Sequence, residues 1–205
     1  MGENNESRQK LLEIARREFL ANGYQKASLR KICNEAGLTT GAVYFLFQDK
    51  SGLFQAVVDE PLARLRETME RHFHEEADSD FTAYVRVRGD HDHFTEELVT
   101  LLYDYYDEMT LLLHKSQGSA YEDITDRITA QLDDYYITLA ERYAAACPGK
   151  QVNRYMLHWF SHEQIHSFVH LLTHVRDRDE ALHDIQPVIE WLIDGWLNYV
   201  LEDAP

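Results

Sequence analysis

The sequence predicts an all-α protein, built either as one domain or as a small head plus a larger body. Apolar residues recur three and four apart through almost every segment, and glycine or proline stands where these segments end. No segment shows the alternation of apolar and polar residues that is typical of a half-buried strand. With 205 residues the chain is long enough to bury a sizeable core, and it has no internal repeat. We therefore expect helices throughout.

The first expected helix spans residues 6 to about 22. Its inward positions are Leu11, Leu12, Ala15, Phe19 and Leu20, and Gly23 is expected to end it.

Residues 28–53 read SLRKICNEAGLTTGAVYFLFQDKSGL and predict two short helices around a tight turn. Ser28 can cap the first helix with its hydroxyl, and Gly37 can adopt the left-handed conformation that ends it. Thr39 or Thr40 then starts a second helix of about two turns. Helix, glycine turn and helix in so short a span form the helix-turn-helix unit, whose second helix enters the major groove of DNA.

Several residues in this region recur at fixed spacings. They are Ser28, Ile32-Cys33, Ala36-Gly37-Leu38-Thr39, Gly41, Tyr44, Phe47, Lys50 and Leu53. Together with Phe19-Leu20-Ala21-Asn22-Gly23-Tyr24 upstream, the pattern covers about 45 residues and resembles the DNA-binding domain of the TetR family of transcriptional repressors. Two positions depart from it. Cys33 replaces the usual alanine, and Leu46 stands where histidine or tyrosine is common, which removes one expected polar phosphate contact.

The resemblance implies an all-α fold with a three-helix helix-turn-helix head over residues 1–50. A linking helix follows at about residues 50–73, and residues 51–205 form a helical bundle for effector binding and dimerisation. The expected DNA-binding residues are Ser28, Arg30, Thr39, Thr40, Gly41, Tyr44 and Lys50. The two threonines are expected at phosphates or base edges, Gly41 at a close backbone approach, and Tyr44 and Lys50 at phosphates.

The charge distribution agrees with this division. Residues 1–50 hold eight Lys/Arg and six Asp/Glu, a net charge of +2. The whole chain has a net charge of −16, so residues 51–205 carry −18. An acidic body repels DNA, and the head is the end expected to meet phosphates.

The sequence also bears on compartment and cofactors. Cys33 and Cys147 are too far apart to suggest a disulfide framework or a zinc ribbon, which favours a reducing cytoplasm. The chain shows neither a secretory leader nor a run of about 18 apolar residues, so we expect no membrane partner. We expect no cofactor.

The linking helix should begin at Asp49-Lys50, where an acidic cap and free backbone N–H groups favour phosphate binding. Pro61 predicts a kink or break in it. Further helices are expected at about residues 80–88, 93–115, 121–147, 151–176 and 184–202, with a polar connector over residues 88–93.

Two aromatic and acidic clusters lie on the helices that the resemblance places around a ligand cavity. The candidate effector residues are Tyr103, Tyr106, Asp107, Tyr135 and Tyr136. Tyrosine rings beside a carboxylate suit a cationic amphipathic molecule, with an unspecified hydrophobic effector as the alternative.

The last two helices are so rich in Trp, Phe and Leu that one chain is not expected to cover all their apolar surface. We expect them to form a homodimer interface as a four-helix bundle. Its expected centre is Phe168, Leu172, Trp191 and Trp196.

Five histidines fall four residues apart from His158 to His174, and residues 162–166 match the zinc-protease motif H-E-x-x-H. His158, His162 and His166 are therefore alternative ligands for a metal-responsive regulator or a zinc-dependent hydrolase. A metal site usually adds a ligand from another element, and the longer protease motif fails at Val169 and Leu172. We expect the row to border a packed interface. The favoured function is a non-enzymatic, ligand-responsive repressor that binds an inverted-repeat operator as a homodimer.

Overall fold

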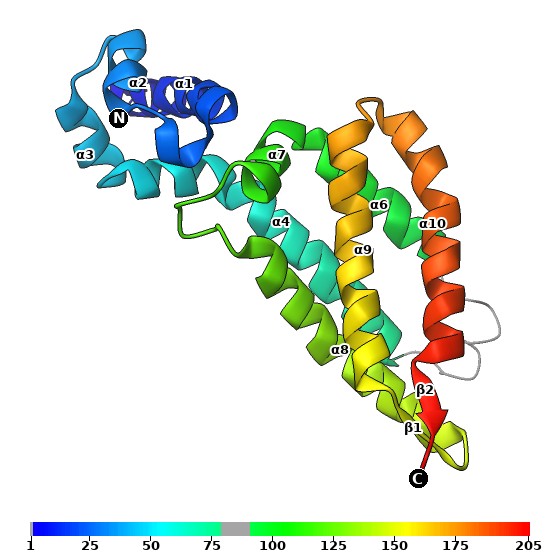
Figure 1. The fold of residues 1–205 in the computed structure, drawn as a ribbon. Coiled ribbons are helices and arrows are strands. Elements are labelled where there is room, and N and C mark those ends of the chain that lie inside the picture. Colours follow the sequence, from blue (N-terminus) through cyan, green and yellow to red (C-terminus); the bar gives the residue numbers. More distant parts are fainter. Residues whose placement is uncertain (1, 79–90) are drawn as a thin grey trace. The chain divides into compact units, whose positions relative to one another are not determined.

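The computed structural model describes residues 2–78 and 91–205 (Figure 1). Within these residues it contains nine helices and two short strands, which confirms the all-α class. The helices are α1 (Gly2–Lys26), α2 (Leu29–Ala36), α3 (Thr40–Phe47), α4 (Lys50–Asp78), α6 (His91–Asp104), α7 (Tyr106–His114), α8 (Ile124–Ala146), α9 (Arg154–His174) and α10 (Arg178–Tyr199). The predicted helix at about 80–88 and residues 88–90 of the polar connector lie outside the described residues, whereas residues 91–93 belong to α6 and not to a connector.

The chain divides into two compact units. The head unit comprises residues 1–65 and 104–124, and the body unit comprises residues 66–103 and 125–205. Residues 104–124 pack with the N-terminal region, although they follow the first body helix in sequence. The functional division at residue 50 stays a prediction.

Aromatic side chains form the core of the head unit. Phe19 and Phe54 are fully buried, and their rings meet edge to face with centroids 5.0 Å apart. The predicted stop at Gly23 appears as an interruption, because this residue has φ 71° and ψ 163° while helical residues continue to Lys26. α7 joins the unit through Tyr24, whose N–H donates to the Lys115 carbonyl at 2.8 Å.

α4 runs unbroken past Pro61, so the predicted break is wrong. Proline removes a single backbone hydrogen bond from a helix interior. Buried side chains on both sides of it, Val58 and Leu65, hold the helix against its neighbours.

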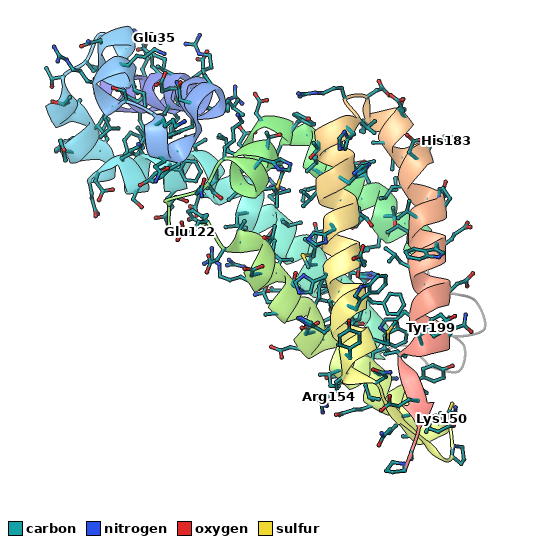
Figure 2. All side chains as sticks on the ribbon, viewed as in Figure 1. Glu35, Glu122, Lys150, Arg154, His183 and Tyr199 are labelled. Carbon is teal, nitrogen blue, oxygen red and sulfur yellow. The ribbon has the colours of Figure 1, made fainter. Side chains whose placement is uncertain are left out.

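In the body unit α9 and α10 pack side by side (Figure 1). The expectation of no strands needs correction, because β1 (Lys150–Val152) pairs antiparallel with β2 (Leu201–Asp203). Figure 2 shows Lys150 of β1 beside β2. Its ammonium donates to the Asp203 carboxylate at 2.7 Å. The pairing joins segments about 50 residues apart, which local sequence patterns do not report.

Two other helix boundaries differ from expectation. The single helix expected at 93–115 is divided between α6 and α7 at Tyr105, whose φ of −114° and ψ of 37° are not helical. α10 begins at Arg178 instead of about 184, because the Asp177 carboxylate caps it by accepting from the N–H of Glu180 at 2.9 Å.

Candidate nucleic-acid interface and ligand cavity

The turn between α2 and α3 has the geometry that the sequence predicted. The Ser28 hydroxyl accepts a hydrogen bond from the Lys31 N–H at 3.3 Å and caps α2. Gly37 is left-handed, with φ 71° and ψ 28°, and its N–H donates to the Asn34 carbonyl at 3.1 Å. The short turn lets α3 start at Thr40.

α3 has one buried and one exposed face. Val43 and Phe47 are buried, whereas Tyr44 and Phe45 are 60% and 80% exposed. The predicted DNA-binding residues Ser28, Arg30, Thr39, Thr40, Gly41 and Tyr44 all lie exposed in the head unit. The sequence analysis did not single out Phe45, although its position four residues after Gly41 places it on the same exposed face.

The Lys50 side chain is less accessible to DNA than the other predicted DNA-binding residues. It is half-buried, its ammonium donates to the Gln25 carbonyl at 3.2 Å, and it lies 4.8 Å from the centre of the Tyr24 ring. Burial lowers the pKa of Lys50. The expected acidic cap is present at the start of α4, where the Asp49 carboxylate accepts from the Gly52 N–H at 2.8 Å. A role for Lys50 at phosphate therefore stays a prediction.

A buried carboxylate links α1 to the start of α2. Glu18 is 6% exposed and accepts hydrogen bonds from the Ser28 N–H at 3.2 Å and from the Lys31 ammonium at 2.6 Å. Burial alone would raise the pKa of Glu18, but these bonds and the charge of Lys31 lower it overall. Glu18 lies seven residues, about two helical turns, after the buried Leu11 and therefore on the same apolar face of α1. A charged residue on that face is the feature of the sequence that could have indicated its burial.

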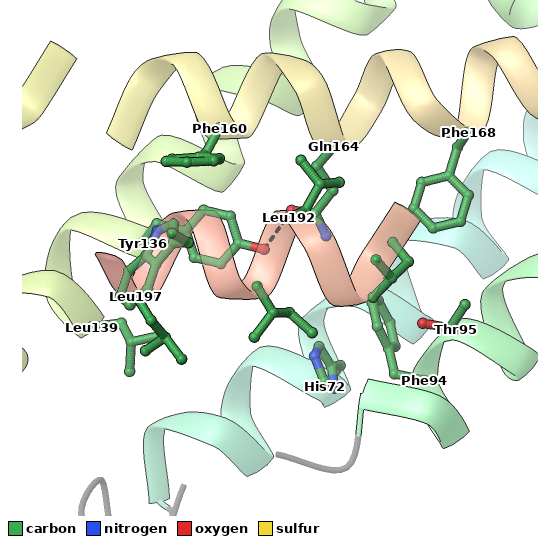
Figure 3. Close-up of a pocket in the computed structure, with 13 residues that line it drawn as sticks. His72, Phe94, Thr95, Tyr136, Leu139, Phe160, Gln164, Phe168, Leu192 and Leu197 are labelled. Carbon is green, nitrogen blue, oxygen red and sulfur yellow. Dashed lines mark hydrogen bonds between the residues drawn. The ribbon is translucent and has the colours of Figure 1, made fainter. Parts of the chain in front are cut away.

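The body unit contains a small cavity between its helices (Figure 3). Its volume is about 70 Å³. The Tyr136 hydroxyl on α8 donates to the Gln164 amide oxygen on α9 at 2.5 Å across it. The other lining residues are His72, Phe94, Thr95, Leu139, Phe160, Phe168, Ile189, Leu192, Ile193, Trp196 and Leu197. Among these described lining residues there is no Asp, Glu, Lys or Arg.

Only Tyr136 of the five predicted effector residues lines this cavity. Tyr103 donates its hydroxyl to the Val175 carbonyl at 3.0 Å, and Tyr135 stacks on Phe73 with ring centres 4.0 Å apart. The other two, Tyr106 and Asp107, lie on α7 in the head unit. Adjacent residues on a helix point in different directions, and packing against other helices decides which of them faces a cavity.

The dimer interface stays a prediction, but most of its expected centre is buried within a single chain. Phe168, Leu172 and Trp196 are 8%, 1% and 8% exposed within one chain, and two of them line the cavity. Trp191 is the exception, with 58% exposure. Much of the apolar surface of α9 and α10 packs within the body unit, which leaves a smaller apolar surface available to a partner. The exposed aromatic residues of these helices are Tyr155, Trp191 and Tyr199.

The first two histidines of the row, His158 and His162, make polar side-chain contacts. His158 Nδ1 lies 2.6 Å from the Asp133 carboxylate, and His158 Nε2 lies 3.1 Å from His162 Nε2. His166 is exposed. Within residues 2–78 and 91–205 no three His, Cys, Asp or Glu side chains are grouped to hold a metal ion. The Asp133 pairing instead gives His158 a polar partner on α8.

In the described part of the chain, no helix has the length and apolar character needed to cross a lipid bilayer.

Comparison with known proteins identifies a family model that matches the N-terminal part of the chain. Residues 11–57 match the model of the bacterial regulatory proteins of the tetR family. The repressor AcnR of Corynebacterium efficiens is 43% identical over 63 residues, which cover 31% of this chain and 34% of AcnR. The regulator UidR of Escherichia coli K12 is 26% identical over 141 residues, 66% of this chain and 61% of UidR. The chain thus matches about a third of the length of the AcnR repressors.

Solved structures share the fold over nearly the whole chain. A transcriptional regulator of the TerR/AcrR family from Aquifex aeolicus has a TM-score of 0.61 at 16% identity and covers 91% of this chain and 99% of its own. NalD, the secondary repressor of the MexAB-OprM multidrug efflux pump in Pseudomonas aeruginosa, has a TM-score of 0.55 at 22% identity, with 91% and 96% covered. Residues 11–57 therefore carry the N-terminal segment of the tetR family, and these relatives support a TetR-family transcriptional regulator, a kind of protein that is not an enzyme.

Proposed function

We propose that this chain is a ligand-responsive repressor that binds an inverted-repeat operator in double-stranded DNA as a homodimer. The observation that carries the proposal is the exposed face of α3, which presents Thr40, Gly41 and Tyr44 beyond a capped glycine turn. Residues 1–50 would act as the DNA-binding head and residues 51–205 as the effector-binding and dimerisation body. AcnR is named a transcriptional repressor, which supports the repressor role.

Two heads can meet successive major grooves only when their recognition helices lie about 34–36 Å apart. A homodimer supplies the two heads, and we place its interface on the exposed aromatics of α9 and α10, with Trp191 retained from the sequence prediction and Tyr155 and Tyr199 added. These rings are the large apolar side chains that the packed body unit leaves exposed in this region.

We place the effector site at the body cavity. Because its described lining carries no carboxylate, a neutral and largely apolar molecule suits it better than the cationic one considered from sequence. Trp196 lines the cavity, and its buried indole N–H has no hydrogen-bond partner in the described structure. A ligand carrying a hydrogen-bond acceptor would satisfy this donor. With about 70 Å³ available, the cavity has to expand to admit a ligand of more than a few atoms.

Such expansion supplies the regulatory mechanism. A ligand that binds better to an expanded body lowers operator affinity by its differential affinity for the two states. α4 is the candidate connection, because it contributes Lys50 to the head unit and His72 to the cavity lining.

Selection of bound duplexes from a random library at fixed salt tests the DNA-binding role. We expect enrichment of a palindromic site. The variant Arg30→Met should weaken binding to all duplexes and reduce the slope of log affinity against log salt by about 1, since Arg30 is exposed in the head unit. The matched control is Arg154→Met, an exposed arginine in the body unit that should leave binding unchanged. If no palindrome is enriched, or if the two variants behave alike, the proposal fails.

A further inference from the structure

Phe45 is the most exposed of the large hydrophobic side chains in the described structure, with 80% of its surface accessible. Successive residues of a helix are offset by about 100°, so Phe45 points almost directly away from the midpoint of Val43 and Phe47, which are buried. Folding of the head unit therefore makes little use of the Phe45 ring. Phe45 therefore lies at the centre of the exposed face of α3.

The chemistry of α3 restricts how this helix can read DNA. Thr40–Phe47 contains no Arg, Lys, Asn or Gln, so it lacks the side chains that make paired hydrogen bonds to guanine or adenine. The apolar feature of the major groove is the C5-methyl group of thymine. An exposed phenyl ring is suited to contact with that methyl group.

Gly41 supports close approach on the same side of the helix. It precedes Phe45 by four residues, so the two positions are neighbours on the α3 surface. A Cβ at Gly41 would have its nearest contact at Thr39 Oγ1, at an ordinary 3.5 Å, so the space beside the phenyl ring is left open on the outer surface.

We propose that Phe45 is a specificity-determining residue that contacts the C5-methyl group of a thymine in each operator half-site. The inference rests on the proposed function, because it requires α3 to lie in the major groove. It adds an apolar base contact to the polar contacts expected from Thr40 and Tyr44. It also predicts an obligatory A·T pair at one position of each half-site.

The test replaces thymine by deoxyuridine, which removes only the methyl group, at one half-site position at a time in the selected operator. For the wild-type chain we expect one position at which affinity falls about fourfold per methyl, the loss expected for one buried methyl group. 5-Bromodeoxyuridine at that position should restore affinity, because bromine occupies the place of the methyl.

The variant Phe45→Ala completes a double-mutant cycle. Its affinity should be lower on the thymine operator and should no longer change when that thymine becomes deoxyuridine. Phe45→Leu, which keeps an apolar side chain, should retain part of the thymine dependence, and Tyr44→Phe should retain all of it. Equal helix content and thermal midpoints show that the variants fold.

Three results would overturn the inference. One is a wild-type chain indifferent to deoxyuridine at every position, and another is Phe45→Ala with undiminished thymine dependence. Both leave a palindromic operator in place, so they refute the role of Phe45 and spare the proposed function. The third, a selection that enriches no palindrome, refutes both.

Discussion

The buried carboxylate of Glu18 yields the sharpest stability prediction, because it joins α1 to the helix-turn-helix unit. One of its oxygens accepts from the Ser28 N–H at 3.2 Å and the other from the Lys31 ammonium at 2.6 Å. The perturbation is Glu18→Ala, which removes both acceptors. Glu18→Gln serves as the conservative variant, since its amide oxygen can still accept from the Ser28 N–H while the negative charge is lost.

The expected magnitude follows from burial. Hydrogen bonds to a charged group contribute about 1.5–3 kcal/mol each, and water around the exposed partners of Glu18 can replace part of that contribution. We therefore expect Glu18→Ala to destabilise the head unit by about 2 kcal/mol at pH 7, with a smaller loss for Glu18→Gln. A loss of 2 kcal/mol corresponds to about thirtyfold faster amide exchange wherever exchange requires opening of the head.

The pKa of Glu18 adds a pH signature. The pKa is lower in the folded chain than in the unfolded one, because the bonds from Lys31 and Ser28 outweigh the opposing effect of burial. The carboxylate therefore contributes its full stabilisation above the unfolded pKa near 4.3 and loses it as pH falls through the lower folded pKa. The stability difference between wild type and Glu18→Gln should be largest near neutral pH and should vanish in acid.

The assay is hydrogen exchange at the amides of α2 in the full chain. Tryptophan fluorescence is unsuitable, because all three tryptophans lie in residues 159–196 of the body unit. Glu35→Gln is the matched control. This glutamate on α2, labelled in Figure 2, pairs with Arg17 on the surface and should matter little. Equal α2 protection in wild type and Glu18→Ala at pH 7, or a gap that persists in acid, would refute the reasoning.

Three further outcomes follow from other parts of the structure. Gly37→Ala and Gly149→Ala should each destabilise the chain by about 1 kcal/mol in urea denaturation, because both glycines have positive φ and open surroundings. Of the two, only Gly37→Ala should lower operator affinity in a DNA titration, and equal effects would contradict the placement of the head. Trp191→Glu should shift sedimentation toward monomer with unchanged helix content, and an unaltered dimer would remove this residue from the interface. Trp196→Phe, measured by calorimetry, should weaken ligands that carry a hydrogen-bond acceptor more than matched ligands that lack one, and equal losses would count against the indole N–H as a contact.

Local chemistry made the helix-turn-helix unit predictable from sequence. The Ser28 cap and the left-handed Gly37 act on residues three or four positions away, so their effect is contained in a short window of sequence. The same holds for the start of α4, where Asp49 caps the helix within three residues. The all-α class and the family resemblance followed from such windows.

Only the tertiary structure decided the lining of the body cavity and the way in which the last two helices pack. Phe168 and Trp196 are apolar and helical whichever way they face, and their inward orientation depends on helices far away in the sequence. The pairing of β1 with β2 and the burial of Glu18 depend likewise on contacts between distant segments. A local pattern determines that a helix has an apolar face. The packing partner determines whether that face becomes core, cavity wall or interface, because burial is a property of the assembled surfaces.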